Sequence, residues 1–253
     1  MNEEFYIGWQ HHAPPGVRAY SRKIVVFLLL TALALPLALT LAQRTIGVAV
    51  FEWGTVKTFS GILEASPYPH LLVLRPGQAE GAFSVYYLVA PFKFGVKPEA
   101  IAALDGKPVT LKGTLIYRGN QTMVEVQPDS IKPSPGPPAA QPLLHISGFS
   151  FPATLVGEIV DSKCYLGVMN PGRLAPHRAC AVRCISGGIP PVLLVRQQDG
   201  PPLYFLLVSS DGHPVNKEVL DMVAQPLEIT GQVTRQAGLL ILRADPATYR
   251  RLK

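Results

Sequence analysis

Residues 24–42, IVVFLLLTALALPLALTLA, form a stretch of 19 residues without a charged side chain. At about 1.5 Å of rise per residue, a helix of this length crosses a hydrocarbon core about 30 Å thick. Pro36 lies inside the stretch, and membrane helices accommodate proline more often than soluble helices do. The sequence therefore predicts one transmembrane helix near the amino-terminal end of the chain.

The charges on either side of this stretch predict its orientation. Arg18, Arg22 and Lys23 precede it, whereas only Arg44 follows it closely. Lys and Arg concentrate on the cytoplasmic side of membrane helices. We therefore expect the helix to lie in a bacterial cytoplasmic membrane, with residues 1–23 as a cytosolic arm and the later domains in the periplasm. The alternative is a cleaved signal peptide, although the apolar stretch exceeds the roughly 7–15 residues of a signal core.

The rest of the chain contains an internal repeat. Residues 104–117, LDGKPVTLKGTLIY, align with residues 222–235, MVAQPLEITGQVTR, and both the proline and the glycine match. Upstream, residues 86–89 match residues 204–207 at the same spacing. Apolar and polar residues alternate in the aligned segments, which is typical of strands with one buried and one exposed face.

Each half has the same predicted order of elements: three strands, a short helix and a two-stranded hairpin. This is the order of an OB-type barrel. The predicted fold class is therefore mainly β, with one N-terminal transmembrane helix followed by two OB-like five-stranded barrels; a pair of small sandwiches is the alternative. The expected strands are 56–64, 70–75, 83–90, 107–117 and 121–127, then 153–161, 192–197, 202–209, 226–235 and 238–243, with helices near 98–104 and 215–223.

The repeat also predicts the domain boundaries. The first OB-like domain is expected over residues 50–130 and the second over residues 150–248. Residues 131–149 between them are rich in proline, which favours an extended, semi-rigid linker.

The composition bears on the kind of partner. The net charge is +6, and OB barrels often bind single-stranded nucleic acid through exposed aromatic side chains. Here no run of Lys or Arg is longer than two residues, and the predicted compartment holds no nucleic acid. We therefore expect the membrane and a membrane protein as partners, and no nucleic acid.

The two halves differ by an insertion that contains all three cysteines. The first strand and the second strand are separated by eight residues in the first half, from Gly61 to Pro69. The same interval spans 34 residues in the second half, from Gly157 to Pro191, so about 26 residues are added.

The insertion contains four residues of the types that bind soft metals: Cys164, His177, Cys180 and Cys184. If residues 176–185 are helical, the last three of these lie on one face, one turn apart. A proline at the first turn and two glycines after the end favour this helix. Thiolate and imidazole together bind zinc, and copper(I) accepts the same ligands. A Cys₃His metal site for zinc or copper is therefore predicted.

Two other interpretations use the same residues. An oxidising compartment favours a structural disulfide, from Cys164 to Cys180 or to Cys184. A redox-active thiol is the other interpretation, with its pKa lowered by His177 or Arg183. The sequence has no G-x-S-x-G, no H-E-x-x-H, no Gly-rich phosphate loop and no C-x-x-C-H, which favours a non-enzymatic role and leaves the redox-active thiol as the one catalytic alternative.

The insertion contains the pattern D-x-x-C, followed by H-x-x-C-A-x-x-C-I-x-G-G-x-P. Here the pattern comprises Asp161, Cys164, His177, Cys180, Ala181, Cys184, Ile185, Gly187, Gly188 and Pro190. In this it resembles a poorly characterised family of exported bacterial OB-like domains, over about residues 153–243. The resemblance implies an exported barrel with a cysteine-bearing insertion, and implies no particular reaction.

These observations predict an accessory or assembly subunit of a membrane complex, facing the periplasm. The alternative is a metal-binding or thiol-redox carrier that acts through the insertion.

Overall fold

A computed structural model describes residues 11–43, 48–74, 83–135, 150–236 and 238–252. The chain divides into two compact units, an N-terminal one that ends at Gly47 and a second one from Val48 to Lys253. Each is described by itself.

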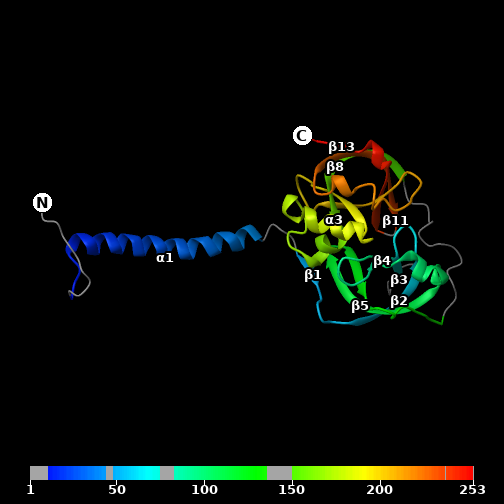
Figure 1. Ribbon diagram of the computed structural model, residues 1–253, viewed down its shortest axis with the longest axis horizontal. Helices are drawn as coiled ribbons and strands as arrows, with labels where there is room; N and C mark the ends of the chain where they lie inside the picture. Colours follow the sequence, from blue (N-terminus) through cyan, green and yellow to red (C-terminus); the bar gives the residue numbers. More distant parts are fainter. Residues whose placement is uncertain (1–10, 44–47, 75–82, 136–149, 237, 253) are drawn as a thin grey trace. The chain divides into compact units, whose positions relative to one another are not determined.

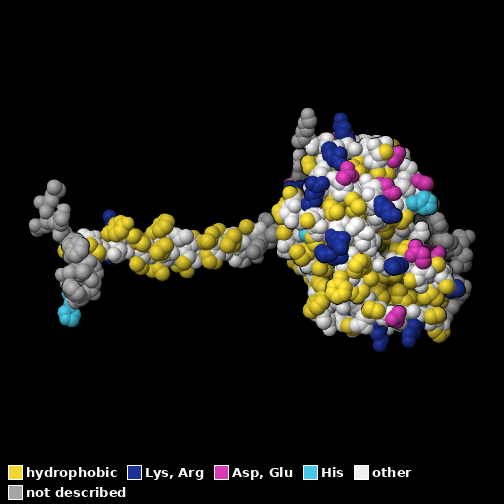
Figure 2. All heavy atoms as spheres, viewed as in Figure 1, with side chains coloured by type: hydrophobic (Ala, Val, Ile, Leu, Met, Phe, Trp, Pro, Cys, Tyr) yellow, Lys and Arg dark blue, Asp and Glu magenta, His cyan; other side chains and the backbone are white. Residues whose placement is uncertain are grey.

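The N-terminal unit is one helix, α1 (Pro15–Gln43) (Figure 1). It is long and apolar enough to cross a membrane, and none of its apolar stretch is buried. Figure 2 shows hydrophobic side chains along most of its length. The helix begins nine residues before the predicted span, so the predicted arm of residues 1–23 is helical from Pro15 onward. Proline is favoured in a first helical turn, and the polar residues that follow it continue the helix.

The first five-stranded barrel has the predicted order of elements. It is closed in the order β2-β3-β4-β6-β5-β2, and only the β4–β6 pairing is parallel. Its elements are β2 (Lys57–Glu64), β3 (His70–Leu74), β4 (Phe83–Val89), α2 (Pro98–Ile101) with a 3₁₀ turn at Ala102–Leu104, β5 (Pro108–Arg118) and β6 (Gln121–Val126).

The second barrel repeats this topology. It is closed in the order β8-β9-β10-β12-β11-β8, again with one parallel pairing, β10–β12. The prediction of a mainly β chain, with one long apolar N-terminal helix and two OB-like five-stranded barrels, is therefore confirmed. The strands are β8 (Ser150–Asp161), β9 (Pro191–Val195), β10 (Leu203–Val208), β11 (Pro226–Gln236) and β12 (Leu239–Arg243).

Two local predictions are wrong. The helix expected near residues 215–223 is only a 3₁₀ turn at Leu220–Met222. A short segment gains little from helix formation, so its tertiary contacts decide its conformation. Here Asn216 Nδ2 donates hydrogen bonds to the carbonyl oxygens of Ile185 and Ile189. The expected linker begins inside the first barrel, because strand β7 (Lys132–Pro133) pairs with β5. Two further short strands, β1 (Ala49–Phe51) and β13 (Arg250–Arg251), pair with β5 and β11.

The repeated glycines lie where strands approach closely. A Cβ atom on Gly61 would lie 2.4 Å from the carbonyl oxygen of Leu72 in the neighbouring strand. The equivalent Gly157 would meet the carbonyl oxygen of Leu194 at 2.5 Å. Both barrels therefore require glycine at the same point of their first strand, which explains part of the repeat in the sequence.

The two barrels share a core. One buried cluster draws side chains from both: Tyr68, Leu72, Val85, Tyr87, Val89, Ile116 and Met123 from the first barrel, and Val160, Cys164, Tyr165, Leu166, Cys184, Ile189, Val192, Leu194, Tyr204, Leu206, Val208, Leu239 and Ile241 from the second. Tyr68, which is 3% exposed, also donates a hydrogen bond to the carbonyl oxygen of Leu207 and accepts one from the amide of Val215. The cysteine insertion lies at this junction.

Candidate metal centre

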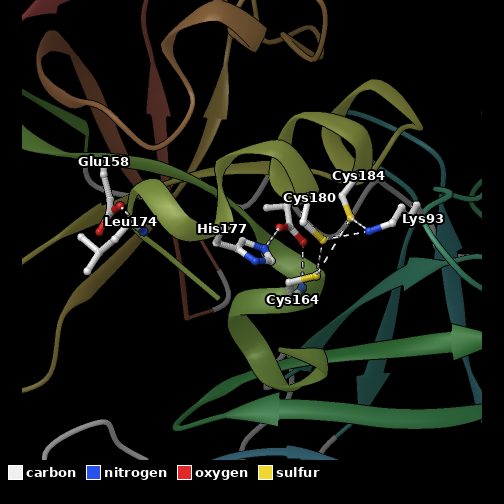
Figure 3. A network of polar contacts seen from close by, with 8 residues as sticks. Lys93, Glu158, Cys164, Leu174, His177, Cys180 and Cys184 are labelled. Carbon is white, nitrogen blue, oxygen red and sulfur yellow. Dashed lines mark hydrogen bonds and ion pairs between the residues drawn. The ribbon is translucent and has the colours of Figure 1, made fainter. Parts of the chain in front are cut away.

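Three thiols from two elements meet at the barrel junction (Figure 3). Cys164 opens η4 (Cys164–Val168), a single wide turn that follows β8. Cys180 and Cys184 lie one turn apart on α3 (Arg178–Ser186). The Sγ atom of Cys164 lies 3.9 Å from that of Cys180 and 4.0 Å from that of Cys184, and all three sulfurs lie within 4.8 Å of one another.

The local sequence explains how Cys164 is positioned. Asp161 ends β8 with its side chain fully buried, and its Oδ1 accepts a hydrogen bond of 2.8 Å from the amide of Cys164. The amide of Met169 donates to the carbonyl oxygen of Cys164 at 3.1 Å, which closes the wide turn. The Cys164 side chain is thereby directed into the core rather than outward.

Helix α3 forms much as the sequence predicts. A 3₁₀ turn, η5 (Ala175–His177), contains Pro176 and leads into it. The last carbonyl groups of α3 accept hydrogen bonds from the amides of Gly187 and Gly188. Gly188 has a φ of 98°, a backbone conformation that favours glycine. Cys180 and Cys184 therefore share the helix face that points at Cys164.

His177 lies beside the three sulfurs but is engaged elsewhere. Its Nε2 atom lies 2.8 Å from Oδ2 of Asp161, and both side chains are buried. His177, Asp161 and Cys164 form a second group whose candidate ligand atoms lie within 4.8 Å of one another. The residues of the Cys₃His prediction thus form two adjoining groups that share Cys164, and the role of His177 as a ligand stays a prediction. Asp161 contacts members of both groups, since it accepts a hydrogen bond from the amide of Cys164 and lies against the ring of His177.

A lysine of the first barrel completes the site. Nζ of Lys93 donates to Sγ of Cys180 at 2.8 Å and lies 3.9 Å from Sγ of Cys184. Figure 3 shows its side chain directed at the two α3 cysteines. Lys93 carries no signal in the sequence, because no spacing or motif connects this loop lysine to Cys180, 87 residues away.

The loop that carries Lys93 is held by a buried lysine. Nζ of Lys163 donates to the carbonyl oxygens of Ala90 and Phe92, at 2.9 and 2.7 Å, and lies 2.5 Å from Oε2 of Glu125. Phe92 has a φ of 61°, which is an unfavourable backbone conformation for an aromatic residue. Its side chain is 84% exposed, so burial of the ring does not compensate for this conformation. Such strain persists only where the surroundings enforce it, and Lys163 provides that restraint.

The same loop lies directly against the end of α3. The amide of Gly95 donates to the carbonyl oxygen of Gly187 at 2.9 Å. A Cβ atom on Gly187 would lie 2.0 Å from the carbonyl oxygen of Lys93, and one on Gly95 would lie 2.2 Å from that of Gly188. Glycine at these positions permits the approach that brings the Lys93 ammonium to the thiols.

The contacts between these groups polarise the thiols. The hydrogen bond from Cys164, supported by the charge of Lys93, holds the pKa of Cys184 below its usual value although burial opposes this. The same hydrogen bond, burial and the charge of Asp161 together raise the pKa of Cys164. The hydrogen bond to Cys180 raises the pKa of Lys93, so this lysine stays protonated. Of the two buried thiols, Cys184 therefore ionises more readily than Cys164.

The sulfur spacing matches that of metal ligands. All three cysteines are free thiols, and the separations of 3.9 and 4.0 Å far exceed a disulfide bond of about 2.05 Å. The disulfide interpretation is therefore not supported. Ligands of a tetrahedral zinc site at about 2.3 Å from the metal lie roughly 3.8 Å apart. The cluster needs little rearrangement to hold one ion.

Comparison with known proteins adds little to this description. The sequence matches no protein-family profile and no curated protein. Among solved structures, the chain is similar to a deletion mutant of the single-stranded DNA binding protein from Thermus aquaticus, at 12% identity over 81% of this chain and 88% of that chain. The TM-score is 0.22, which is too low to inform either fold or function. The OB-type topology rests on the strand pairing itself.

Proposed function

We propose that this protein is a membrane-anchored metal-binding protein whose three cysteine thiolates hold one soft metal ion. The observation that carries the proposal is the convergence of three free thiols from two elements, with sulfur separations typical of a metal site. Helix α1, which is long and apolar enough to cross a membrane, supports the anchor.

The ligand set favours copper(I). Soft thiolates select copper(I) and zinc among the common ions, but a structural zinc ion takes four ligands. Among the described residues, the ammonium of Lys93 rather than a fourth ligand lies against Cys180 and Cys184, and Asp161 engages His177. A copper(I) ion with three thiolates is left with excess negative charge, which the Lys93 ammonium partly neutralises.

The accessibility of the ligands supports a carrier or assembly role. Cys180 is partly exposed, whereas Cys164 and Cys184 are buried. A metal-binding side chain of a partner protein therefore reaches Cys180 first, and the ion can transfer to that partner without opening the core. The flanking charges of α1 and the resemblance of the insertion to exported domains support a periplasmic location, where the protein would act as an accessory or assembly subunit for a membrane complex.

Metal loading tests this proposal. The full-length protein, reduced and solubilised in a nonionic detergent, is titrated anaerobically with copper(I) or zinc and then desalted. We expect one copper(I) ion per chain with sulfur-only coordination in X-ray absorption. Each of Cys164→Ser, Cys180→Ser and Cys184→Ser should abolish stoichiometric binding, and Ser186→Ala on α3 is the control. Failure of the wild-type protein to retain copper would refute the proposal, and nitrogen coordination would make His177 a ligand.

A second candidate function is thiol–disulfide exchange, which the contact between Lys93 and the partly exposed Cys180 favours. In this reaction, the Cys180 thiolate attacks a substrate disulfide and releases one of its thiols. Cys164, whose sulfur lies 3.9 Å away, then resolves the mixed disulfide and releases the second thiol. Reversible formation of a Cys164–Cys180 disulfide in glutathione buffers, together with failure to bind copper, would select this function over the first.

A further inference from the structure

We infer that a short apolar surface at the start of the second unit docks on the lipid surface of the membrane that α1 spans. It consists of Val48, Phe51, Trp53 and Val56, and we call it the Trp53 surface. The inference rests on the membrane anchor of the proposed function, and it does not depend on the thiol cluster. It gives the second unit a lipid contact of its own, in addition to the helix.

The Trp53 surface exposes large apolar side chains to solvent. Trp53 is 79% exposed, Val48 80% and Val56 46%. Phe51 is half-buried, and its ring makes a T-shaped contact with the ring of Trp53 at a centroid separation of 5.3 Å. Single exposed apolar residues are common on soluble proteins, but apolar residues that gather in one place mark an interaction surface.

The backbone holds Trp53 in this exposed position. Residues Ala49–Phe51 are strand β1, which pairs with β5. A tight turn follows, in which the amide of Trp53 donates to the carbonyl oxygen of Phe51 at 2.7 Å. The amide of Thr55 donates to the carbonyl oxygen of Glu52 at 2.9 Å. Because the turn is already ordered, docking through Trp53 costs little conformational entropy.

The Trp53 surface carries no uncompensated charge. Between residues 45 and 56 the only charged side chain is Glu52, and its Oε2 atom lies 2.5 Å from Nζ of Lys57. This pairing matters because an unpaired charge is unfavourable in an apolar medium. Tryptophan, by contrast, favours the boundary between headgroups and acyl chains, since its ring is apolar and its N–H is polar.

The length of the chain limits how far this surface can lie from lipid. Helix α1 ends at Gln43, one residue after the apolar stretch 24–42. Five peptide units join Gln43 to Val48, and they span at most about 18 Å when fully extended. The headgroup region on each side of the hydrocarbon core is itself about 5–8 Å thick. The anchor therefore keeps Val48 close to the headgroups, and the Trp53 surface begins at that residue.

Tryptophan fluorescence tests the inference, because the chain has only two tryptophans, Trp9 and Trp53. In the full-length Trp9→Phe variant, Trp53 is the one remaining indole. This protein is reconstituted in phosphatidylcholine vesicles whose acyl chains carry bromine either near the headgroup or near the chain end. We expect bromine near the headgroup to quench Trp53 more strongly than bromine near the chain end. Acrylamide in the aqueous phase should quench it weakly.

Matched substitutions show whether the surface itself drives the contact. Val48→Asp and Val56→Asp, each in the Trp9→Phe background, place a charge in the surface. Each should shift the equilibrium by at least about 10-fold toward the undocked state, with less quenching by lipid and more by acrylamide. Phe94→Asp introduces the same charge at an aromatic residue outside the surface that is 57% exposed, and it should change neither. All three positions are exposed, so no core contact is lost.

Three results would overturn the inference. One is quenching of Trp53 by acrylamide but not by brominated lipid in protein that still floats with the vesicles, which would leave the anchor standing without the docking. Another is lipid quenching that is unchanged in both Asp variants, which would show that tethering alone brings the indole to lipid. The third is protein that does not float with the vesicles, which would contradict the anchor of the proposed function as well.

Discussion

Nζ of Lys163 in the second barrel lies 2.5 Å from Oε2 of Glu125 in the first, and the two side chains are 2% and 16% exposed. The ion pair spans the junction of the barrels one residue before Cys164. It also fixes the loop that presents Lys93, through the carbonyl oxygen of Phe92. Packing of the two barrels therefore also brings Lys93 to the thiol cluster.

The first prediction concerns this ion pair. Lys163→Met should lower the free energy of unfolding by about 3–5 kcal/mol, because it leaves the Glu125 carboxylate and two carbonyl groups without their buried partner. Denaturant unfolding of the detergent-solubilised protein measures the change. The matched control is Lys57→Met, which removes an exposed lysine 2.5 Å from Glu52 and should cost only about 0–1 kcal/mol. Equal costs for the two variants would contradict the structural role of Lys163.

The second prediction concerns the titration of the metal-free thiols, followed by ultraviolet thiolate absorbance. Since the pKa of Cys184 is lowered and that of Cys164 is raised, the first thiolate should appear below the ordinary pKa of a free cysteine, and the last well above it. Lys93→Met removes a charge that favours the thiolate, so the first step should move to higher pH. Lys97→Met, in the same loop, is the control. A first step that is unchanged in Lys93→Met would show that the ammonium does not act on the cluster.

Much of this architecture could be predicted from the sequence because it depends on local patterns. Alternation of apolar residues gives the strands, and the aligned segments 104–117 and 222–235 give the duplication. The helix that bears Cys180 and Cys184 was also predictable, since a proline at its start and glycines at its end delimit it.

What could not be predicted depends on contacts between the barrels. Lys93, Glu125 and Lys163 lie on separate elements, and no periodicity brings them together. The shared core is likewise invisible in the repeat, because each half reads as a complete barrel by itself. The contact of His177 was not predictable for a different reason, because the spacing of residues in the insertion does not show that the buried Asp161 of the same barrel holds the His177 ring.

The third prediction separates His177 from the proposed ligands. His177→Ala should retain one copper(I) ion per chain, because the three sulfurs remain. It should lower the free energy of unfolding by about 1–3 kcal/mol, since the buried carboxylate of Asp161 loses a hydrogen-bond partner. Elemental analysis after desalting and denaturant unfolding give the two values. Loss of the metal in His177→Ala, comparable with that in Cys164→Ser, would instead support a Cys₃His site.

The fourth prediction concerns the segment between the barrels. With a protease site inserted between residues 140 and 141, cleavage should leave the two fragments associated in size-exclusion chromatography, because the barrels share one buried core. They should also unfold in a single transition.

Tyr68→Phe removes two buried hydrogen bonds across the junction and leaves the amide of Val215 without that partner, so it should lower the free energy of unfolding by about 1–3 kcal/mol. It should therefore weaken the association of the cleaved fragments, whereas Tyr86→Phe, outside the shared core, should not. Fragments that separate on cleavage of the wild-type protein, each still folded, would show that the barrels are independent and that the thiol cluster does not require the first one.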